Sequence, residues 1–220
     1  MNDKYYKLIE EQSKLSDLRA EQKKDYVLKE NMRKWMYRVT EEFASIKLSD
    51  LEKEHIDKLI GLKDKPIDVL VGSKDRNESL RVGYAIVNYC IKQGYFGPSD
   101  VKITSLSSAL DNIHGAFEAK EWKTNFFDNN AKMFLIHGCN KRKAELAKKG
   151  DIPFWEEFLD FISHGNRNFI ICYTLSSDEK IEDNGKIRMK LSHLPELNTE
   201  ILKYRTQIFS YDSLFKPKAN

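Results

Sequence analysis

Hydrophobic and polar positions follow two different periodic patterns along the chain. Residues 1–40 contain no Gly or Pro and predict a helix, with sparse apolar anchors first and then a stripe at three- and four-residue spacing. The stripe consists of Leu28, Met32, Trp35, Met36, Val39 and Phe43. Such a face needs a cover, and the pattern leaves open whether the chain's own core or a partner protein supplies it.

From residue 46 onward, short apolar runs alternate with helical stretches. Ser49 followed by Glu52 has the signature of a capping box and predicts a helix start. The expected strands are 67–71, 101–104, 133–136, 168–173 and 207–211, and the expected helices are 79–93, 107–119, 153–162 and 197–204. The runs MFLI and NFIICY are apolar on both faces, which is typical of a parallel sheet covered on both sides. The sequence therefore predicts a helical extension at 1–42 and an α/β domain at 43–220.

Composition narrows the class of protein. The 220 residues are 40% hydrophobic and 32% charged, as in an ordinary soluble globular protein. The first ten residues do not resemble a signal peptide and no apolar run approaches membrane-spanning length, so we expect a cytoplasmic protein with no membrane partner. Cys90, Cys139 and Cys172 lie in apolar contexts and predict buried reduced thiols rather than disulfides or a metal site.

Net charge is only +3, but its distribution is uneven. Residues 1–40 hold ten Lys or Arg against seven Asp or Glu, whereas residues 41–220 balance at 27 against 27. The basic extension suits contact with an acidic partner or nucleic acid, and it equally suits a solvated helix face.

An eight-residue segment has the outline of a phosphate-binding loop, Gly-x-x-x-x-Gly-Lys-Ser/Thr. Gly72 stands at the first glycine, Ser73, Lys74, Asp75 and Arg76 at the intervening positions, and Asn77, Glu78 and Ser79 at the second glycine, lysine and hydroxyl positions. Asn tolerates a left-handed turn, so the loop's shape can survive. Glu78, however, places an anion where the β- and γ-phosphates need a cation.

The Mg²⁺-binding part of a nucleotide site also lacks its characteristic residues. A Mg²⁺-binding strand ends in two acids, but the strand at 133–136 is followed by His137 and Gly138. A lone histidine at a strand end is more often structural than a ligand or base. Loss of the lysine and both acids predicts no catalytic residues and no required cofactor, while weak binding of ATP or ADP stays open.

These segments, taken in order from about 43 to 213, resemble the AAA+ domain of bacterial helicase loaders of the DnaC and DnaI type and of the related IstB transposon ATPases. The matching stretches are FASIKLSDL, VLVGSKDRNESLRVGYAIVNYCIKQGY, VKITSLSSALDNI, KMFLIHG, FWEEFLDFISHGNRNFIICYTLSS and LNTEILKYRTQIFSYDS. The resemblance implies a P-loop NTPase-like, five-stranded parallel sheet with helices on both faces and no C-terminal lid domain.

Some family positions carry other residues here. Where the family places a sensor asparagine, the chain offers Thr174, Ser176 or Ser177. Arg205 matches an arginine that can reach a neighbouring subunit's nucleotide, although an arginine at a helix end also has a purely structural explanation.

The resemblance implies a role in DNA replication with a replicative helicase or another loader subunit as partner. Met32, Trp35, Met36 and Val39 are then the candidate partner-binding residues. Lys141, Arg142, Lys143, Lys148 and Lys149 form a basic cluster that either contacts single-stranded DNA or is solvated.

Three functions remain open at this point. The first is a catalytically silent adaptor that loads or recruits a helicase. The second is an active ATPase in which Lys74 or Arg76 replaces the missing lysine. The third is an antagonist that joins a host loader or helicase assembly and blocks it.

Overall fold

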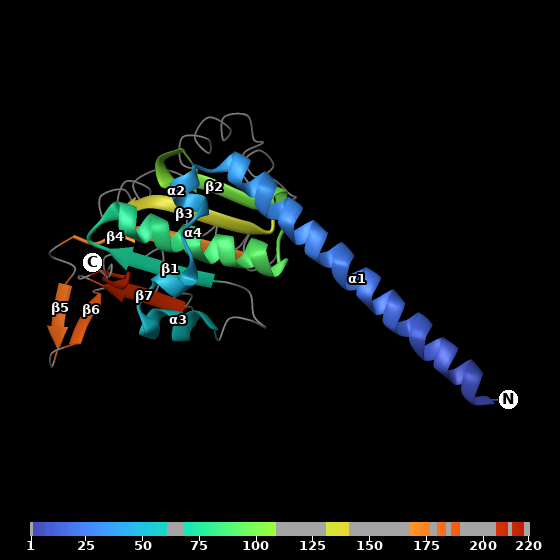
Figure 1. The fold of residues 1–220 in the computed structure, drawn as a ribbon. Helices are drawn as coiled ribbons and strands as arrows, with labels where there is room; N and C mark the ends of the chain where they lie inside the picture. The colour runs from blue at the N-terminus through green and yellow to red at the C-terminus, as the bar shows by residue number, and fades with distance from the viewer. Residues whose placement is uncertain are drawn as a thin grey trace, which may run out of the picture.

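A computed structural model describes residues 2–60, 68–108, 131–140, 168–176, 180–183, 186–189, 206–210 and 213–217. At its centre is a sheet in the order β2-β3-β4-β1-β7, in which every neighbouring pair is parallel (Figure 1). The strands are β1 (Asp68–Ser73), β2 (Val101–Ser105), β3 (Met133–Asn140), β4 (Asn168–Thr174) and β7 (Thr206–Ser210). The predicted α/β class with a parallel sheet is confirmed.

The central strands are apolar because both of their faces are covered. Every residue of β1 from Val69 to Ser73 is buried, as are the first six residues of β4. Strands β5 (Lys180–Asp183) and β6 (Lys186–Met189) were not predicted, and they form a separate antiparallel pair.

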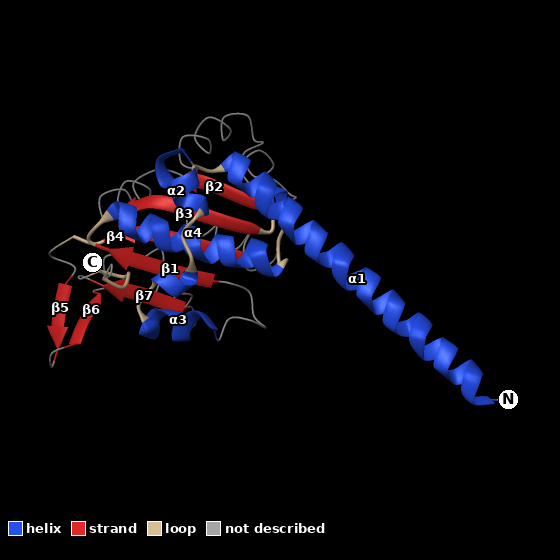
Figure 2. Ribbon diagram, viewed as in Figure 1, coloured by secondary structure: helices blue, strands red, loops and turns tan. Residues whose placement is uncertain are grey.

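The helices are α1 (Asn2–Arg38), α2 (Glu41–Ala44), α3 (Lys53–Ile60) and α4 (Arg76–Gln93), with 3₁₀ turns η1 (Leu48–Asp50) and η2 (Pro98–Asp100). Helix α4 lies across the sheet and contacts β1, β3 and β4 (Figure 2). It ends at Gly94, whose φ of 75° is the left-handed conformation expected of a glycine cap. The helices predicted at 153–162 and 197–204, and most of the one at 107–119, lie outside the described residues.

The predicted helix start at Ser49 is wrong. Ser49 lies within η1, and α3 begins only at Lys53. The capping contact in this segment belongs to Asp50, whose carboxylate accepts the backbone N–H of Lys47 at 2.9 Å. A short capped 3₁₀ turn therefore stands where the sequence suggested the first turn of an α-helix.

Helix α1 consists of two physically different parts. Residues 12–27 are exposed throughout, and Figure 1 shows this part projecting away from the domain. The last turns instead pack on α4, where Trp35 is completely buried and donates its indole N–H to Oδ1 of Asn88 at 2.7 Å.

Asn88 also holds the segment that follows α1. Its Nδ2 donates to the backbone oxygens of Phe43 at 2.8 Å and Ile46 at 2.9 Å, and the ring of Phe43 stacks on Tyr84 with centroids 4.3 Å apart. Because a buried amide must use its polar atoms, Asn88 fixes the path of the chain into the domain.

The cysteine prediction is confirmed, since Cys90, Cys139 and Cys172 are buried free thiols. Burial raises the pKa of the Cys90 thiol to about 12 and raises that of Cys172 well above its ordinary value. Among the helices of the described ranges, none is both long and apolar enough to cross a bilayer.

Candidate functional site

The turn between β1 and α4 is much shorter than a phosphate-binding loop. Strand β1 continues through Gly72 and Ser73, which pair with β4 on one side and β7 on the other. Helix α4 already begins at Arg76, so only Lys74 and Asp75 connect the two elements. A phosphate cradle needs several consecutive backbone N–H groups curved around an anion, and a two-residue connection has no room for that curve.

The expected left-handed turn at Asn77 is wrong, because Asn77 lies inside α4. Asp75 is the N-cap, and its carboxylate accepts the backbone N–H of Asn77 at 2.8 Å. The protein's own carboxylate thus takes a helix N-terminal donor that a phosphate would otherwise use.

Glu78 is the centre of a hydrogen-bond network. Its carboxylate accepts the hydroxyl of Ser73 at 2.6 Å, the hydroxyl of Ser213 at 2.7 Å and the backbone N–H of Leu214 at 2.8 Å. Ser73 in turn accepts the backbone N–H of Asp75 at 3.1 Å. An anion in the first turn also complements the helix dipole. The acid that replaces the lysine of a phosphate-binding loop is therefore part of the structure of this turn.

Residues 213–217, here named the C-terminal strap, connect this network to η1. The backbone N–H of Glu52 donates to the oxygen of Leu214 at 3.1 Å, and that of Lys216 donates to the oxygen of Asp50 at 2.9 Å. Leu51 and Phe215 form the antiparallel bridge between these two bonds. Sequence reasoning missed the strap, because its contacts with Glu78 span more than 130 positions and no local pattern marks them.

The remaining loop positions have ordinary structural roles or point outward. The Ser79 hydroxyl, expected at the Mg²⁺ position, is buried and donates to the backbone oxygen of Arg76 at 3.0 Å. Lys74, Asp75, Arg76 and Asn77 are exposed. Nothing in the described turn brings Lys74 or Arg76 into the position of the missing lysine.

Strand β3 does not end where the sequence predicted. It continues from Ile136 to Asn140 through a bulge, and Gly138 adopts a φ of 71° within it. His137 lies opposite Ser105 of β2. No acid occupies the end of β3, and the described residues contain no cluster of three or more His, Cys, Asp or Glu that could hold a metal.

Polar side chains line up along the carboxyl edge of the sheet. Asn140 pairs with Thr174, Thr174 with Ser73, and Ser73 with Ser210. Thr174, one of the predicted sensor positions, therefore lies beside Ser73 of β1. Ser177, Arg205 and the basic cluster Lys141, Arg142, Lys143, Lys148 and Lys149 lie outside the described residues.

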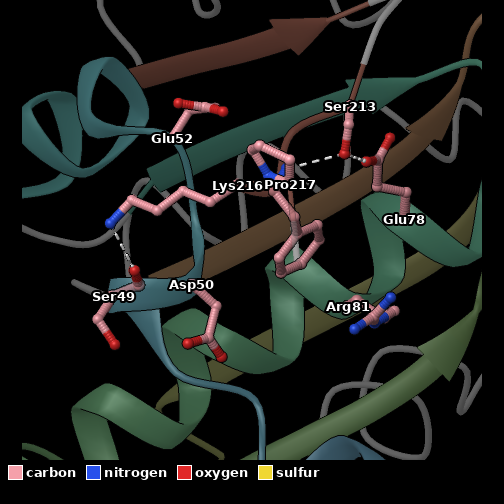
Figure 3. A pocket seen from close by; sticks show the side chains of 9 residues that line it. Ser49, Asp50, Glu52, Glu78, Arg81, Ser213, Lys216 and Pro217 are labelled. Atoms are coloured by element: carbon pink, nitrogen blue, oxygen red, sulfur yellow. Dashed lines mark hydrogen bonds between the residues drawn. The ribbon is translucent and has the colours of Figure 1, made fainter. Parts of the chain in front are cut away.

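A cleft of about 780 Å³ lies between the C-terminal strap, η1 and the start of α4 (Figure 3). It is lined by Ser49, Asp50, Glu52, Glu78, Arg81, Ser213, Phe215, Lys216 and Pro217. The guanidinium of Arg81 lies 4.8 Å from the centroid of the Phe215 ring. The amine of Lys216 donates to the backbone oxygen of Ser49 at 2.8 Å.

The residues predicted to form the partner-binding surface are not all exposed in the structure. Trp35 is completely buried against α4, so its place in that surface is wrong, and Met32 and Val39 are partly buried against the same core. Met36 remains 54% exposed. Tyr37 beside it is also exposed, and further exposed apolar side chains lie earlier on α1, at Leu15, Leu18, Tyr26 and Val27.

No protein-family model matches the chain, and no curated protein matches it.

Proposed function

We propose that this chain is a catalytically silent, AAA+-like adaptor of DNA replication, acting as a helicase loader or loader-like accessory protein through protein–protein contacts. The observation that carries the proposal is the engagement of Glu78. At the position of the phosphate-binding lysine, this carboxylate accepts hydrogen bonds from Ser73, Ser213 and Leu214. Nucleotide binding would place phosphate beside this anion and would have to separate it from the strap.

The strand order supports the AAA+-like part of the proposal. In the sheet β2-β3-β4-β1-β7, the first strand lies between β4 and β7 rather than beside β2. A dinucleotide-binding sheet would instead place its second strand next to the first. The P-loop relationship and the five-stranded AAA+ sheet are therefore parts of the proposal, and they rest on this order together with the resemblance of the segments.

The alternative of an active ATPase gains no support from the geometry. It requires Lys74 or Arg76 to neutralise a triphosphate, yet both are exposed on a turn too short to cradle one. An antagonist of a host loader would use the same contacts as an adaptor and fits the same observations.

The projecting part of α1 is the proposed partner-binding element. Residues 12–27 are exposed throughout, and Leu15 and Leu18 are each 54% exposed while Tyr26 is 69% exposed. Helices without tertiary contacts gain little stability in water, so a second protein packing on this segment would stabilise it. We place the contact with a replicative helicase or loader subunit there.

The nucleotide part is tested by melting curves of the full chain with Mg²⁺-ATP and with Mg²⁺-ADP. A ligand at about a hundred times its Kd stabilises a protein by roughly 2.7 kcal/mol, which a melting curve detects easily. We expect no shift with either nucleotide. A clear upward shift would overturn the silent site and restore the ATPase alternative.

The partner part is tested by titrating the purified replicative helicase from the same genome with the full chain. We expect a complex that is lost in the variant Leu15→Glu, Leu18→Glu. Ser16→Glu is the matched control, because it adds a charge at an exposed position without removing an apolar side chain. An absent complex, or equal binding by the double variant, would contradict the proposed arm.

A further inference from the structure

The partly buried guanidinium of Arg81 has a donor without a hydrogen-bond acceptor among the described residues. Its Nε is buried and has no hydrogen-bond acceptor in the part of the chain that the structure describes. The group stacks on Phe215 and lines the cleft between the strap, η1 and α4 (Figure 3). A buried donor without an acceptor is costly, and a missing ion or ligand is one of the few ways to explain it.

The ordinary partner of Arg81 is occupied elsewhere. On a helix, Glu78 is three residues away and could pair with it. The carboxylate of Glu78 is instead bound by Ser73, Ser213 and the backbone N–H of Leu214. None of the ion pairs found among the described residues includes Arg81. The guanidinium thus stacks on an aromatic ring, and among the described residues no carboxylate pairs with it.

This arrangement is suited to an anion with two oxygen atoms. A guanidinium binds carboxylate and phosphate groups through two parallel hydrogen bonds, and stacking on an aromatic ring orients it in advance. The volume of about 780 Å³ exceeds that of such a group alone and lies in the usual range for small-molecule sites. The cleft therefore has room for a larger body beside that group, where Phe215 and Pro217 supply apolar surface.

Other charges in the cleft limit how negative that ligand can be. Asp50, Glu52 and Glu78 line it together with the cations Arg81 and Lys216. The Asp50 carboxylate accepts the backbone N–H of Lys47, and the Glu52 carboxylate acts electrostatically on His55, where it opposes the lowering of that residue's pKa. In Figure 3, Glu52 and Arg81 lie on opposite sides of the view. A polyanion would meet these acids, but a single anionic group at Arg81 would not require their displacement.

We propose that this cleft binds a small molecule whose carboxylate or phosphate group is held by Arg81 and whose remaining part carries no further negative charge. The site is separate from the proposed replication role and does not depend on it. The guanidinium of Arg81 recognises the anionic group through two parallel hydrogen bonds. The negative charge of Glu52 repels ligands that carry more charge, such as triphosphates.

The experiment is a titration of the ¹⁵N-labelled full chain, followed through the Nε–Hε NMR signals of its arginines. The probes are acetate, inorganic phosphate and tripolyphosphate at constant ionic strength, and the Arg81 signal is assigned by triple-resonance spectra. We expect a saturable shift of that signal with acetate or with inorganic phosphate, and whichever binds more tightly identifies the preferred group. A shift that stays linear through millimolar concentrations of both would overturn the proposal.

Three variants test which residues bind the anion. Arg81→Lys keeps the charge but loses the two parallel guanidinium hydrogen bonds, and we expect it to weaken binding on the order of tenfold to a hundredfold. Because this variant lacks the Arg81 signal, its binding and that of the unaltered protein are compared through the backbone amide signals of residues 213–216. Arg19→Gln removes an exposed arginine of α1 and should leave binding unchanged. Glu52→Gln should increase the affinity for tripolyphosphate more than that for acetate. Equal binding by Arg81→Lys, or tightest binding of tripolyphosphate by the unaltered protein, would contradict the assignment.

Discussion

At the scale of single residues, the surroundings of Glu78 decide what its charge does. Beside a triphosphate, a carboxylate at this position would be repelled. Here it accepts two hydroxyl groups and one backbone N–H, and it connects the end of β1, the first turn of α4 and the C-terminal strap. A substitution that would damage an ATPase is therefore a stabilising contact in this molecule.

Replacing Glu78 with Ala should release the strap. The change removes an acceptor from three donors, and we expect the free energy of unfolding to fall by about 2 kcal/mol, because hydrogen bonds to charged groups contribute about 1.5–3 kcal/mol and this site is partly solvated. Urea unfolding measures the loss, and limited proteolysis near residues 213–217 reports detachment. Lys74→Ala, at an exposed position of the same turn, is the control. Equal stability of the two variants would show that the network contributes nothing.

His55 gives the protein a source of acid sensitivity. It is 2% exposed on α3, and burial lowers its pKa, with the nearby acid Glu54 opposing and Lys58 adding to the shift. Because the folded pKa lies below the unfolded value of about 6.5, the unfolded chain binds the proton more readily. The contribution of neutral His55 is thus complete above the unfolded pKa and is lost as pH falls through that region towards the folded pKa.

We therefore expect His55→Gln to lose less stability than the unaltered protein between about pH 7 and about pH 5. Urea midpoints at both pH values, measured in one buffer mixture at fixed ionic strength, test the difference. At the higher pH the variant should be no more stable than the parent, since His55 is 2% exposed and a side chain of another shape must fit the same space. Parallel loss in both proteins would assign the acid sensitivity to other groups.

At the scale of elements, the contact of α4 with the sheet depends on Gly83. A Cβ at this position would lie 2.6 Å from Cδ1 of Leu135 and 2.8 Å from Sγ of Cys172. Those distances are too short for unbonded atoms, so side chains of β3 and β4 set how closely the helix approaches. Glycine in the interior of a helix normally weakens it, and here close packing explains its presence.

Gly83→Ala should consequently destabilise the domain although alanine favours helix. Overpacking costs about 1–3 kcal/mol and the gain in helix propensity offsets about 1 kcal/mol, so we expect a net loss of up to about 2 kcal/mol in urea unfolding. Adding Cys172→Ala should remove one of the two clashes and couple favourably with Gly83→Ala in a double-mutant cycle. Strict additivity, or a more stable Gly83→Ala protein, would contradict this packing.

At the scale of the whole molecule, α1 combines a structural and a projecting part in one continuous helix. Leu28, Met32 and Trp35 face the domain, and Arg38 donates to the backbone oxygens of Pro98 and Val101. Residues 12–27 contact nothing that would bury them. The domain should therefore depend on the last turns of α1 and be independent of the projecting part.

Deleting residues 1–24 should leave the melting temperature of the domain within a degree or so, since a contribution of 1 kcal/mol would move it by about 2–4 °C in a chain of this size. Trp35→Ala is the contrasting variant, and we expect it to cost about 3–5 kcal/mol because a fully buried indole and its bond to Asn88 are both lost. Calorimetry of both proteins tests the division. A large loss on truncation would mean that the projecting part stabilises the domain after all.

Local signals predicted much of the fold, and the reason is visible in particular elements. The strands at 133–136 and 168–173 are apolar on both faces because both faces are buried in the folded sheet. Their sequence pattern therefore predicted them directly. The predicted end of α4 at residue 93 is also confirmed, because Gly94 takes the left-handed conformation that closes a helix. Boundaries that depend on turn geometry were less certain, as the early start of α4 at Arg76 and the bulge in β3 illustrate.

The sequence by itself determined the class of the domain, the buried thiols and the chemical mismatch at Glu78, because periodicity, apolar context and charge are properties of neighbouring residues. Only the tertiary structure decided that Trp35 belongs to the core, that Asn77 is helical and that Glu78 holds the strap. Each of these features depends on partners distant along the chain. Trp35 is bound by Asn88, and Glu78 is bound by Ser213 and Leu214. The short turn before Asn77 depends on the pairing of β1 with β4 and β7. Long-range contacts leave no periodic trace, so only the folded chain brings them together.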